Sequence, residues 1–249
     1  MSLTVALKAA YGLVMAADSR VTEGYTLEGP KVQDNSVKFI RLDRDWGVQT
    51  YGNSNIGSAG IGALRDRIEA NASLAASQEG LLEECRAVFK RESEKWSREN
   101  PGNHRQDKDV GFVLAGYGKG SAEPVIVNFQ SPGFLDENMR HGCLLAGQWH
   151  IARFFLQRLY IRDARLEKMK ELAVLLLNAT MKSEKTVGGA IRLAEITPEE
   201  GFRWATDEDV EALRKNSERL EGEFHELLHA SLDGYPDAPA EDGLRKGPS

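Results

Sequence analysis

The sequence predicts an α+β domain, in which helices pack on the outside of β-sheets. Some short runs are wholly apolar or alternate apolar with polar residues, which is typical of strands. Other runs carry apolar residues at helical spacing and end at glycine or proline. These runs follow the order strands, two helices, strands, two helices, strand, helix, with no internal repeat. Strands and helices that occur in separate groups indicate an α+β domain.

The first 22 residues predict a β-hairpin that begins almost at the chain terminus. Apolar runs at 3–9 and 13–17 are separated by the turn signal Tyr11-Gly12. Chain termini usually fray unless a sheet or another contact holds them. A first strand that enters a sheet would therefore fix Ser2, whose hydroxyl is a candidate nucleophile with the α-amino group as its base.

A loop is expected at 23–35, because this stretch is polar and contains Gly24, Gly29 and Pro30. Residues 36–42 alternate with period two and predict a half-buried strand, with 46–51 as its partner. The junction after Gly52 predicts a helix start, at which Asn53, Ser54 and Asn55 are all candidate N-caps. The remaining expected elements are helices near 56–68 and 79–99, strands at 110–117, 124–129 and 142–147, a helix-rich segment at 149–181, a strand at 190–196 and a charged helix at 207–229.

Composition excludes several classes of protein. Apolar residues make up 41% and charged residues 28% of the chain, which is ordinary for a globular protein, and the formal net charge is −6. An acidic chain without basic clusters predicts no binding to nucleic acid or to an anionic membrane. No apolar run approaches the length of a transmembrane helix, and the N-terminus lacks a signal-peptide pattern. We therefore expect a cytoplasmic protein, with Cys85 and Cys143 as buried thiols.

Residues 12–22, GLVMAADSRVT, resemble the second strand of proteasome β-type subunits, which belong to the N-terminal nucleophile (Ntn) hydrolases. The family pattern is an N-terminal Thr, a short strand, a turn and then G-V-V-L-A-A-D-x-R-x-T. Aligned on this run without gaps, the family's N-terminal Thr falls on Ser2, and its structural Asp and Arg fall on Asp18 and Arg20. The resemblance implies a four-layer αββα sandwich and self-assembly.

The separation of a lysine and a glycine further along the chain agrees with this alignment. The family places a catalytic Lys fourteen residues before a Gly whose backbone N–H forms the oxyanion hole, and Lys38 and Gly52 stand at this separation. Weaker matches follow in order at 115–118, where the chain reads AGYG, and at the pair Gly188-Gly189. The resemblance thus covers about residues 2–200. It divides the chain into an Ntn-hydrolase domain at 1–205, a helical extension at 206–233 and a tail at 234–249, whose composition predicts disorder.

The resemblance implies a role for each matched residue. Removal of Met1 would leave Ser2 first in the chain, with a free α-amine of pKa about 7.7–8.0 as general base. The positive charge of Lys38 would lower the pKa of that amine and of the hydroxyl, and Asp18 would pair with Lys38. The backbone N–H of Gly52 would stabilise the oxyanion, a contribution of about 2.7–4 kcal/mol per donor. If Met1 remains, Ser2 has an amide nitrogen and no base.

The chain also departs from the family pattern. The family's Gly-Ser-Gly-Ser turn meets residues 145–148, so its hydroxyl position is Ala146. The family's Asp-x-x-Ser-Gly-Gly meets residues 184–189, where Glu184 keeps the carboxylate but Val187 replaces the hydroxyl residue. Two supports of the N-terminal amine are therefore missing.

Each motif also has an ordinary interpretation. A single Lys38 on a strand would be a solvated surface charge, and residues 18–20 alone would form a turn with a local ion pair. The motif His225-Glu226-x-x-His229 places two imidazoles on one face of a predicted helix, a spacing suited to Zn²⁺. A third ligand would come from the predicted tail, so a charged helix with two surface histidines is the simpler interpretation.

Three functional hypotheses follow. The leading one is a proteasome-like peptidase that cleaves peptide or polypeptide substrates through Ser2, with Asp18, Lys38, Gly52 and Glu184 as further site residues. We expect no cofactor and no bound metal, a homo-oligomer in rings or stacks, and no assignable ATPase partner. The alternatives are a catalytically inactive structural or binding subunit and a zinc peptidase that uses His225, Glu226 and His229.

Overall fold

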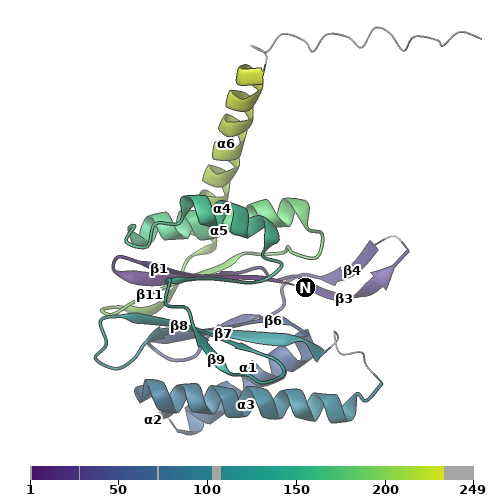
Figure 1. Ribbon diagram of the computed structural model, residues 1–249, viewed down its shortest axis with the longest axis vertical. Coiled ribbons are helices and arrows are strands. Elements are labelled where there is room, and N and C mark those ends of the chain that lie inside the picture. The colour runs from purple at the N-terminus through teal and green to yellow at the C-terminus, as the bar shows by residue number, and fades with distance from the viewer. Residues whose placement is uncertain (1, 28, 72, 103–107, 233–249) are drawn as a thin grey trace, which may run out of the picture.

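The computed structural model describes residues 2–27, 29–71, 73–102 and 108–232, and these form a four-layer αββα sandwich (Figure 1). Two five-stranded sheets lie face to face, and helices cover the outer face of each. The predicted α+β class and the αββα layering are both confirmed. Within the described residues, no helix combines the length and the apolarity needed to cross a membrane.

The first sheet contains the N-terminal strand near its centre. Its antiparallel order is β10 (Cys143–Gly147), β1 (Leu3–Ala9), β2 (Gly12–Ala17), β11 (Arg192–Thr197) and β12 (Gly201–Trp204). Strand β1 pairs with β2 on one side and with β10 on the other. Both faces of β1 and β2 are covered, which explains why these strands are almost continuously apolar.

The second sheet carries the other half of the pocket described below. Its antiparallel order is β5 (Phe39–Arg41), β6 (Trp46–Gly52), β7 (Val110–Tyr117), β8 (Pro124–Gln130) and β9 (Asp136–Asn138). Helices α1 (Ser54–Ala70), α2 (Ser73–Ala76) and α3 (Gln78–Glu99) form the layer on its outer side (Figure 1). The Asn53 side chain caps α1 by accepting a hydrogen bond from the Ile56 N–H, at 3.0 Å. Of the three candidate N-caps that the sequence offers, the structure therefore selects Asn53.

The fourth layer consists of α4 (His150–Leu159) and α5 (Leu166–Ser183), which pack on the first sheet. Helix α6 (Asp207–Leu232) packs on α5 with its first turns and then projects away from the sandwich (Figure 1). Three apolar cores fill the spaces between the layers: one under α4 and α5, one under α1 and α3, and one between the sheets.

One predicted loop is wrong. Residues 23–35 lie largely in a two-stranded hairpin, β3 (Val21–Thr26) and β4 (Gly29–Gln33), which extends from one end of the sandwich (Figure 1). Glycine and proline suggested irregular structure, but Gly29 and Pro30 pair with Thr26 and Tyr25 inside this hairpin. Proline is tolerated there because, within the described residues, no third strand pairs with the hairpin.

Smaller differences concern the edges of the sheets. The strand expected at 36–42 shrinks to β5, because Ser36 donates its N–H to the Ser19 carbonyl instead of joining the ladder. Strands β9 and β12 and helix α2 were not predicted; they are short and carry no long apolar pattern. The predicted tail at 234–249 lies outside the described residues.

Candidate active site

A pocket of about 930 Å³ opens at one end of the sandwich, where both sheets and the β3–β4 hairpin meet. Three of the predicted site residues line it together: Ser2, Lys38 and Gly52. Ser2 directly precedes β1 of the first sheet, Lys38 directly precedes β5 of the second sheet, and Gly52 ends β6. The fold therefore brings these residues to one cavity from separate parts of the chain.

Backbone contacts on both sides hold Ser2 in place. The Ser2 carbonyl accepts a hydrogen bond from the Gln148 N–H at 2.8 Å, and the Leu3 N–H donates to Asp18 Oδ1 at 3.0 Å. Gly147 has φ +86°, and a Cβ there would lie 1.9 Å from the Ser2 carbonyl oxygen. Only glycine therefore permits the close approach of the β10 end to Ser2. Ser2 is 4% exposed.

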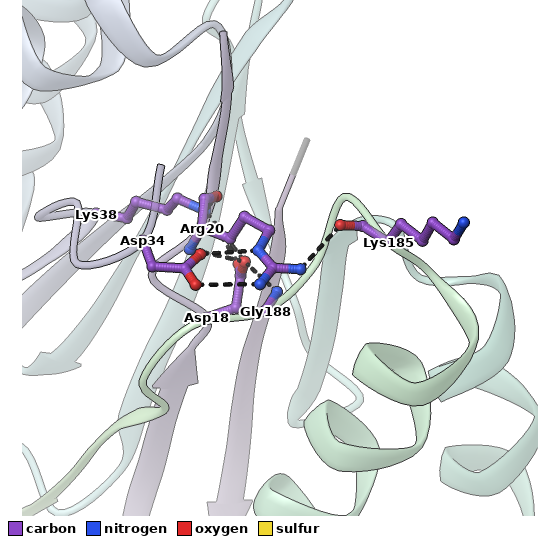
Figure 2. Close-up of polar contacts among 6 residues, drawn as sticks. All are labelled: Asp18, Arg20, Asp34, Lys38, Lys185 and Gly188. Atoms are coloured by element: carbon purple, nitrogen blue, oxygen red, sulfur yellow. Dashed lines mark hydrogen bonds and ion pairs between the residues drawn. The ribbon is translucent and has the colours of Figure 1, made fainter. Parts of the chain in front are cut away.

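Asp18 and Lys38 form a buried ion pair beside this pocket (Figure 2). Lys38 Nζ lies 3.1 Å from Asp18 Oδ1 and 3.2 Å from Oδ2, and it also donates to the Arg20 carbonyl. Asp18 Oδ2 accepts from the N–H groups of Arg20 at 3.2 Å and Gly188 at 3.1 Å. The carboxylate thus has several donors, and the ammonium has a fixed position.

Burial acts on both members of this pair. It raises the pKa of Asp18, while Lys38 and the backbone donors Gly188 and Leu3 act in the opposite direction. Burial also lowers the pKa of Lys38, and the negative charge of Asp18 partly offsets this effect. Lys38 is only 5% exposed, so its ammonium is poorly hydrated and depends on Asp18 for its charge. Its positive field acts in a pocket wall where water screens it weakly.

Arg20 connects three segments around the ion pair. Its guanidinium binds both oxygens of Asp34, at 2.8 and 3.1 Å, and donates to the Lys185 carbonyl at 3.0 Å (Figure 2). Arg20 directly precedes β3, and Asp34 directly follows β4. The bidentate pair therefore closes the base of the hairpin whose residues Val21 and Gln33 line the pocket.

Gly52 occupies a position that excludes other residues. Its φ is +86°, and a Cβ would lie 2.3 Å from the Asp109 carbonyl oxygen. The Asn53 N–H donates to that same carbonyl at 2.8 Å, which fixes the junction between β6 and α1. The backbone beside Ser2 and Lys38 is therefore rigid and free of side-chain bulk at this point.

Glu184 lies apart from the residues that line the pocket. It caps the C-terminus of α5, and its carbonyl accepts from the Val187 N–H at 2.9 Å. This turn leads to Gly188, which donates to Asp18. Val187 is fully buried in the core under the helices, and Ala146 is buried between the sheets. The catalytic role of Glu184 stays a prediction.

The zinc-site hypothesis falls on side chains that the structure does not describe, those of His225 and His229. Among the residues that it does describe, no group of three His, Cys, Asp or Glu side chains is placed to hold a metal ion.

Several pocket residues carry no functional signal in the sequence. Thr50 and Tyr51 directly precede Gly52 in β6, Ser54 and Ser58 lie four residues apart on α1, and Gln148 follows β10. The folded chain brings these residues to one pocket from separate elements. Asp34 lies inside the predicted loop at 23–35, so the sequence does not single it out. The β-branched and aromatic residues of 21–26 are the one indication of a hairpin.

Comparison with solved structures identifies the same architecture in other proteins. Anbu (ancestral beta-subunit) from Yersinia bercovieri is 17% identical, with a TM-score of 0.69 over 96% of this chain and 99% of that one. A structure described as the helical assembly of the Anbu complex from Pseudomonas aeruginosa is 21% identical, with a TM-score of 0.75 over 97% and 100%. At these identities the likeness concerns the fold. No curated protein sequence matches.

The family comparison covers most of the chain. Residues 2–196 match the model of the family described as "Proteasome subunit". The matched region begins at Ser2 and ends in β11, so it includes the whole second sheet, every strand of the first sheet except β12, α1 to α5 and all the residues that line the pocket. The chain therefore belongs to the proteasome subunit family.

Proposed function

We propose that this protein is an N-terminal nucleophile peptidase in which Ser2 attacks the scissile carbonyl once Met1 has been removed. The observation that carries this proposal is the shared pocket: a buried Ser2, the buried ammonium of Lys38 held by Asp18, and the constrained Gly52 backbone. A peptide chain is the proposed substrate, and membership of the proteasome subunit family supports this choice.

The proposed reaction has two halves. The Ser2 α-amine takes the proton of the Ser2 hydroxyl as its oxygen bonds to the substrate carbonyl carbon, and the Gly52 N–H stabilises the oxyanion. The proton passes to the leaving amine as the peptide bond breaks, which leaves an acyl ester on Ser2. Water, deprotonated by the same amine, then releases the acid and restores the hydroxyl. Lys38 contributes a positive charge that favours the unprotonated amine and the developing alkoxide.

The proposal includes a homo-oligomer in the cytoplasm. The Pseudomonas aeruginosa relative is described as a helical assembly, and this chain exposes apolar side chains around α4, namely Phe154, Leu159 and Ile161. Exposed apolar groups near one another are typical of contact surfaces.

Two measurements test the peptidase. Intact mass spectrometry should show loss of Met1, and incubation with a peptide epoxyketone should add one reagent mass to Ser2. The epoxyketone is diagnostic because it closes a ring with the hydroxyl and the free amine of one residue. Ser2→Ala should process normally and acquire no adduct. Retained Met1, or an unlabelled Ser2 in a processed chain, would contradict the proposal.

A catalytically inactive subunit is the second candidate. It is favoured by Ala146 and Val187, which are packed in apolar cores where the family pattern places hydroxyl residues. This candidate predicts a stable assembly that does not bind the epoxyketone covalently and that forms equally well after Ser2→Ala substitution.

A further inference from the structure

We infer that Asp34 is a positioning residue for the reaction: by fixing the Arg20 side chain, it holds the Arg20 carbonyl against Lys38 and the hairpin base against the pocket. This inference rests on the proposed function of Ser2 and Lys38. Asp34 itself lies outside the residues that line the pocket, so it would act through Arg20.

The Arg20–Asp34 contact has the geometry of a specific pair. Two guanidinium nitrogens bind the two carboxylate oxygens, at 2.8 and 3.1 Å, and a third donates to the Lys185 carbonyl at 3.0 Å. A planar fork of this kind fixes orientation as well as distance. Figure 2 shows the guanidinium spanning from Asp34 to the Lys185 loop.

Two glycines leave room for this pair. A Cβ on Gly188 would lie 2.6 Å from Arg20 Cζ, and a Cβ on Gly189 would lie 2.5 Å from Ser19 Oγ and 3.3 Å from the Asp34 Cβ. Gly189 also has φ +75°, a conformation that suits glycine. The loop after α5 is thus shaped around the Arg20 guanidinium and the Asp34 side chain.

The same residue, Arg20, also supports the ion pair. Its carbonyl accepts from Lys38 Nζ, and its N–H donates to Asp18 Oδ2 at 3.2 Å. Release of the guanidinium would loosen residue 20 and therefore one of the acceptors that orient the ammonium. The same change would remove the ion pair that joins the two ends of the β3–β4 hairpin, since Arg20 directly precedes β3 and Asp34 directly follows β4.

Asp34 also contributes charge. The charged groups that act on Lys38 are Asp18, Asp34 and Arg20. The negative charge of Asp34 raises the pKa of Lys38, whereas the positive charge of Arg20 lowers it. Neutralising Asp34 would remove one of the two negative charges that act on Arg20 and one of the two that raise the pKa of Lys38, so the pKa of Lys38 would fall and its positive charge would be lost at lower pH.

The test compares Asp34→Asn with Asp34→Glu and with a matched control, Glu84→Gln. Glu84 also binds an arginine through both oxygens, at 2.7 and 3.5 Å from Arg67, but the pair joins α1 to α3 and does not line the pocket. The measurement is the maximal rate of Ser2 acylation by the epoxyketone as a function of pH, in the full chain.

For Asp34→Asn we expect the rate to fall about twofold to fivefold, which is the size expected for one partly exposed, well-oriented ion pair. The basic limb of the pH profile should move to lower pH, whereas a purely structural defect would reduce the rate without moving that limb. Asp34→Glu should recover most of the rate, and Glu84→Gln should match the unmodified protein. A parent-like rate and pH profile in Asp34→Asn would overturn the inference.

A second readout separates this inference from the proposed function. Absence of acylation in the unmodified protein would refute the proposed peptidase activity. Amide hydrogen exchange of residues 34–38 would then test by itself whether the Arg20–Asp34 ion pair holds the hairpin base. Faster exchange in both Asp34→Asn and Arg20→Lys, but not in Glu84→Gln, supports it. Unchanged exchange in both variants overturns it.

Discussion

At the scale of single residues, the Lys38–Asp18 pair places two opposite charges where water barely reaches either of them. Asp18 is 1% exposed and Lys38 is 5% exposed. Removing one partner of such a pair leaves the other charge buried and uncompensated, at a cost of about 3–5 kcal/mol. The unfolding free energies of the single variants Lys38→Met and Asp18→Asn should therefore depend on pH in opposite directions.

In Lys38→Met, the pKa of Asp18, already raised above 3.8 by burial, rises further because the lysine no longer lowers it. A raised carboxyl pKa contributes stability that is present below the ordinary value and lost as pH rises through the raised value. The difference in unfolding free energy between Lys38→Met and the parent should therefore widen as pH increases.

In Asp18→Asn, the pKa of Lys38 falls further below 10.5 because the aspartate no longer raises it. A lowered lysine pKa contributes stability that is present above the ordinary value and lost as pH falls through the lowered value. This difference should widen as pH decreases. Urea denaturation at about pH 5, 7 and 9 measures how the loss of unfolding free energy in each variant depends on pH. If this loss changes with pH in the same direction in both variants, the ion pair is contradicted.

The resemblance of residues 12–22 to proteasome β-type subunits, together with the family's separation between its Lys and its Gly, was enough to predict the Asp18, Lys38 and Gly52 positions. Their catalytic roles remain proposals. Asp34 could not be found in this way. Its partner Arg20 lies fourteen residues earlier, and only the pairing of β3 with β4 brings the two together.

At the scale of elements, the start of α1 carries part of the pocket wall. The Asn53 cap and the Asp109 carbonyl hold the helix where it meets β6. Asn53→Ala should lower the unfolding free energy by about 1 kcal/mol, because the Ile56 N–H loses its acceptor. Denaturation curves measure this loss. Asn55→Ala is the matched control, since Asn55 lies two residues later in α1 and is exposed; an equal loss in both variants would rule out capping.

The predicted elements also show which strands and helices can be located from apolar patterns in the sequence. Strands β1, β2 and β7 and helices α1, α3 and α5 carry long apolar patterns because each is covered by a core. Strand β9 reads Asp-Glu-Asn and is exposed throughout, so only its pairing with β8 defines it. The β3–β4 hairpin was missed for a related reason: Gly29 and Pro30 suggest a loop wherever their strand partners are unknown.

At the scale of the whole molecule, the proposed assembly has a direct measurement. One chain has a mass of 27.6 kDa. Sedimentation velocity or light scattering should find a larger particle whose mass is a multiple of this value and does not depend on modest dilution. A particle that remains at 27.6 kDa at every concentration would contradict the homo-oligomer.

The two ends of the described chain differ in a way that matters for handling the protein. Ser2 lines the pocket, its carbonyl accepts from the Gln148 N–H, and the next N–H, that of Leu3, donates to Asp18, so a group joined to the Ser2 nitrogen starts beside that pocket. Helix α6 instead leads away from the sandwich (Figure 1). An affinity tag or fluorescent fusion at the N-terminus would thus remove the free amine that the proposed mechanism requires, whereas a fusion attached after α6 would leave that amine free.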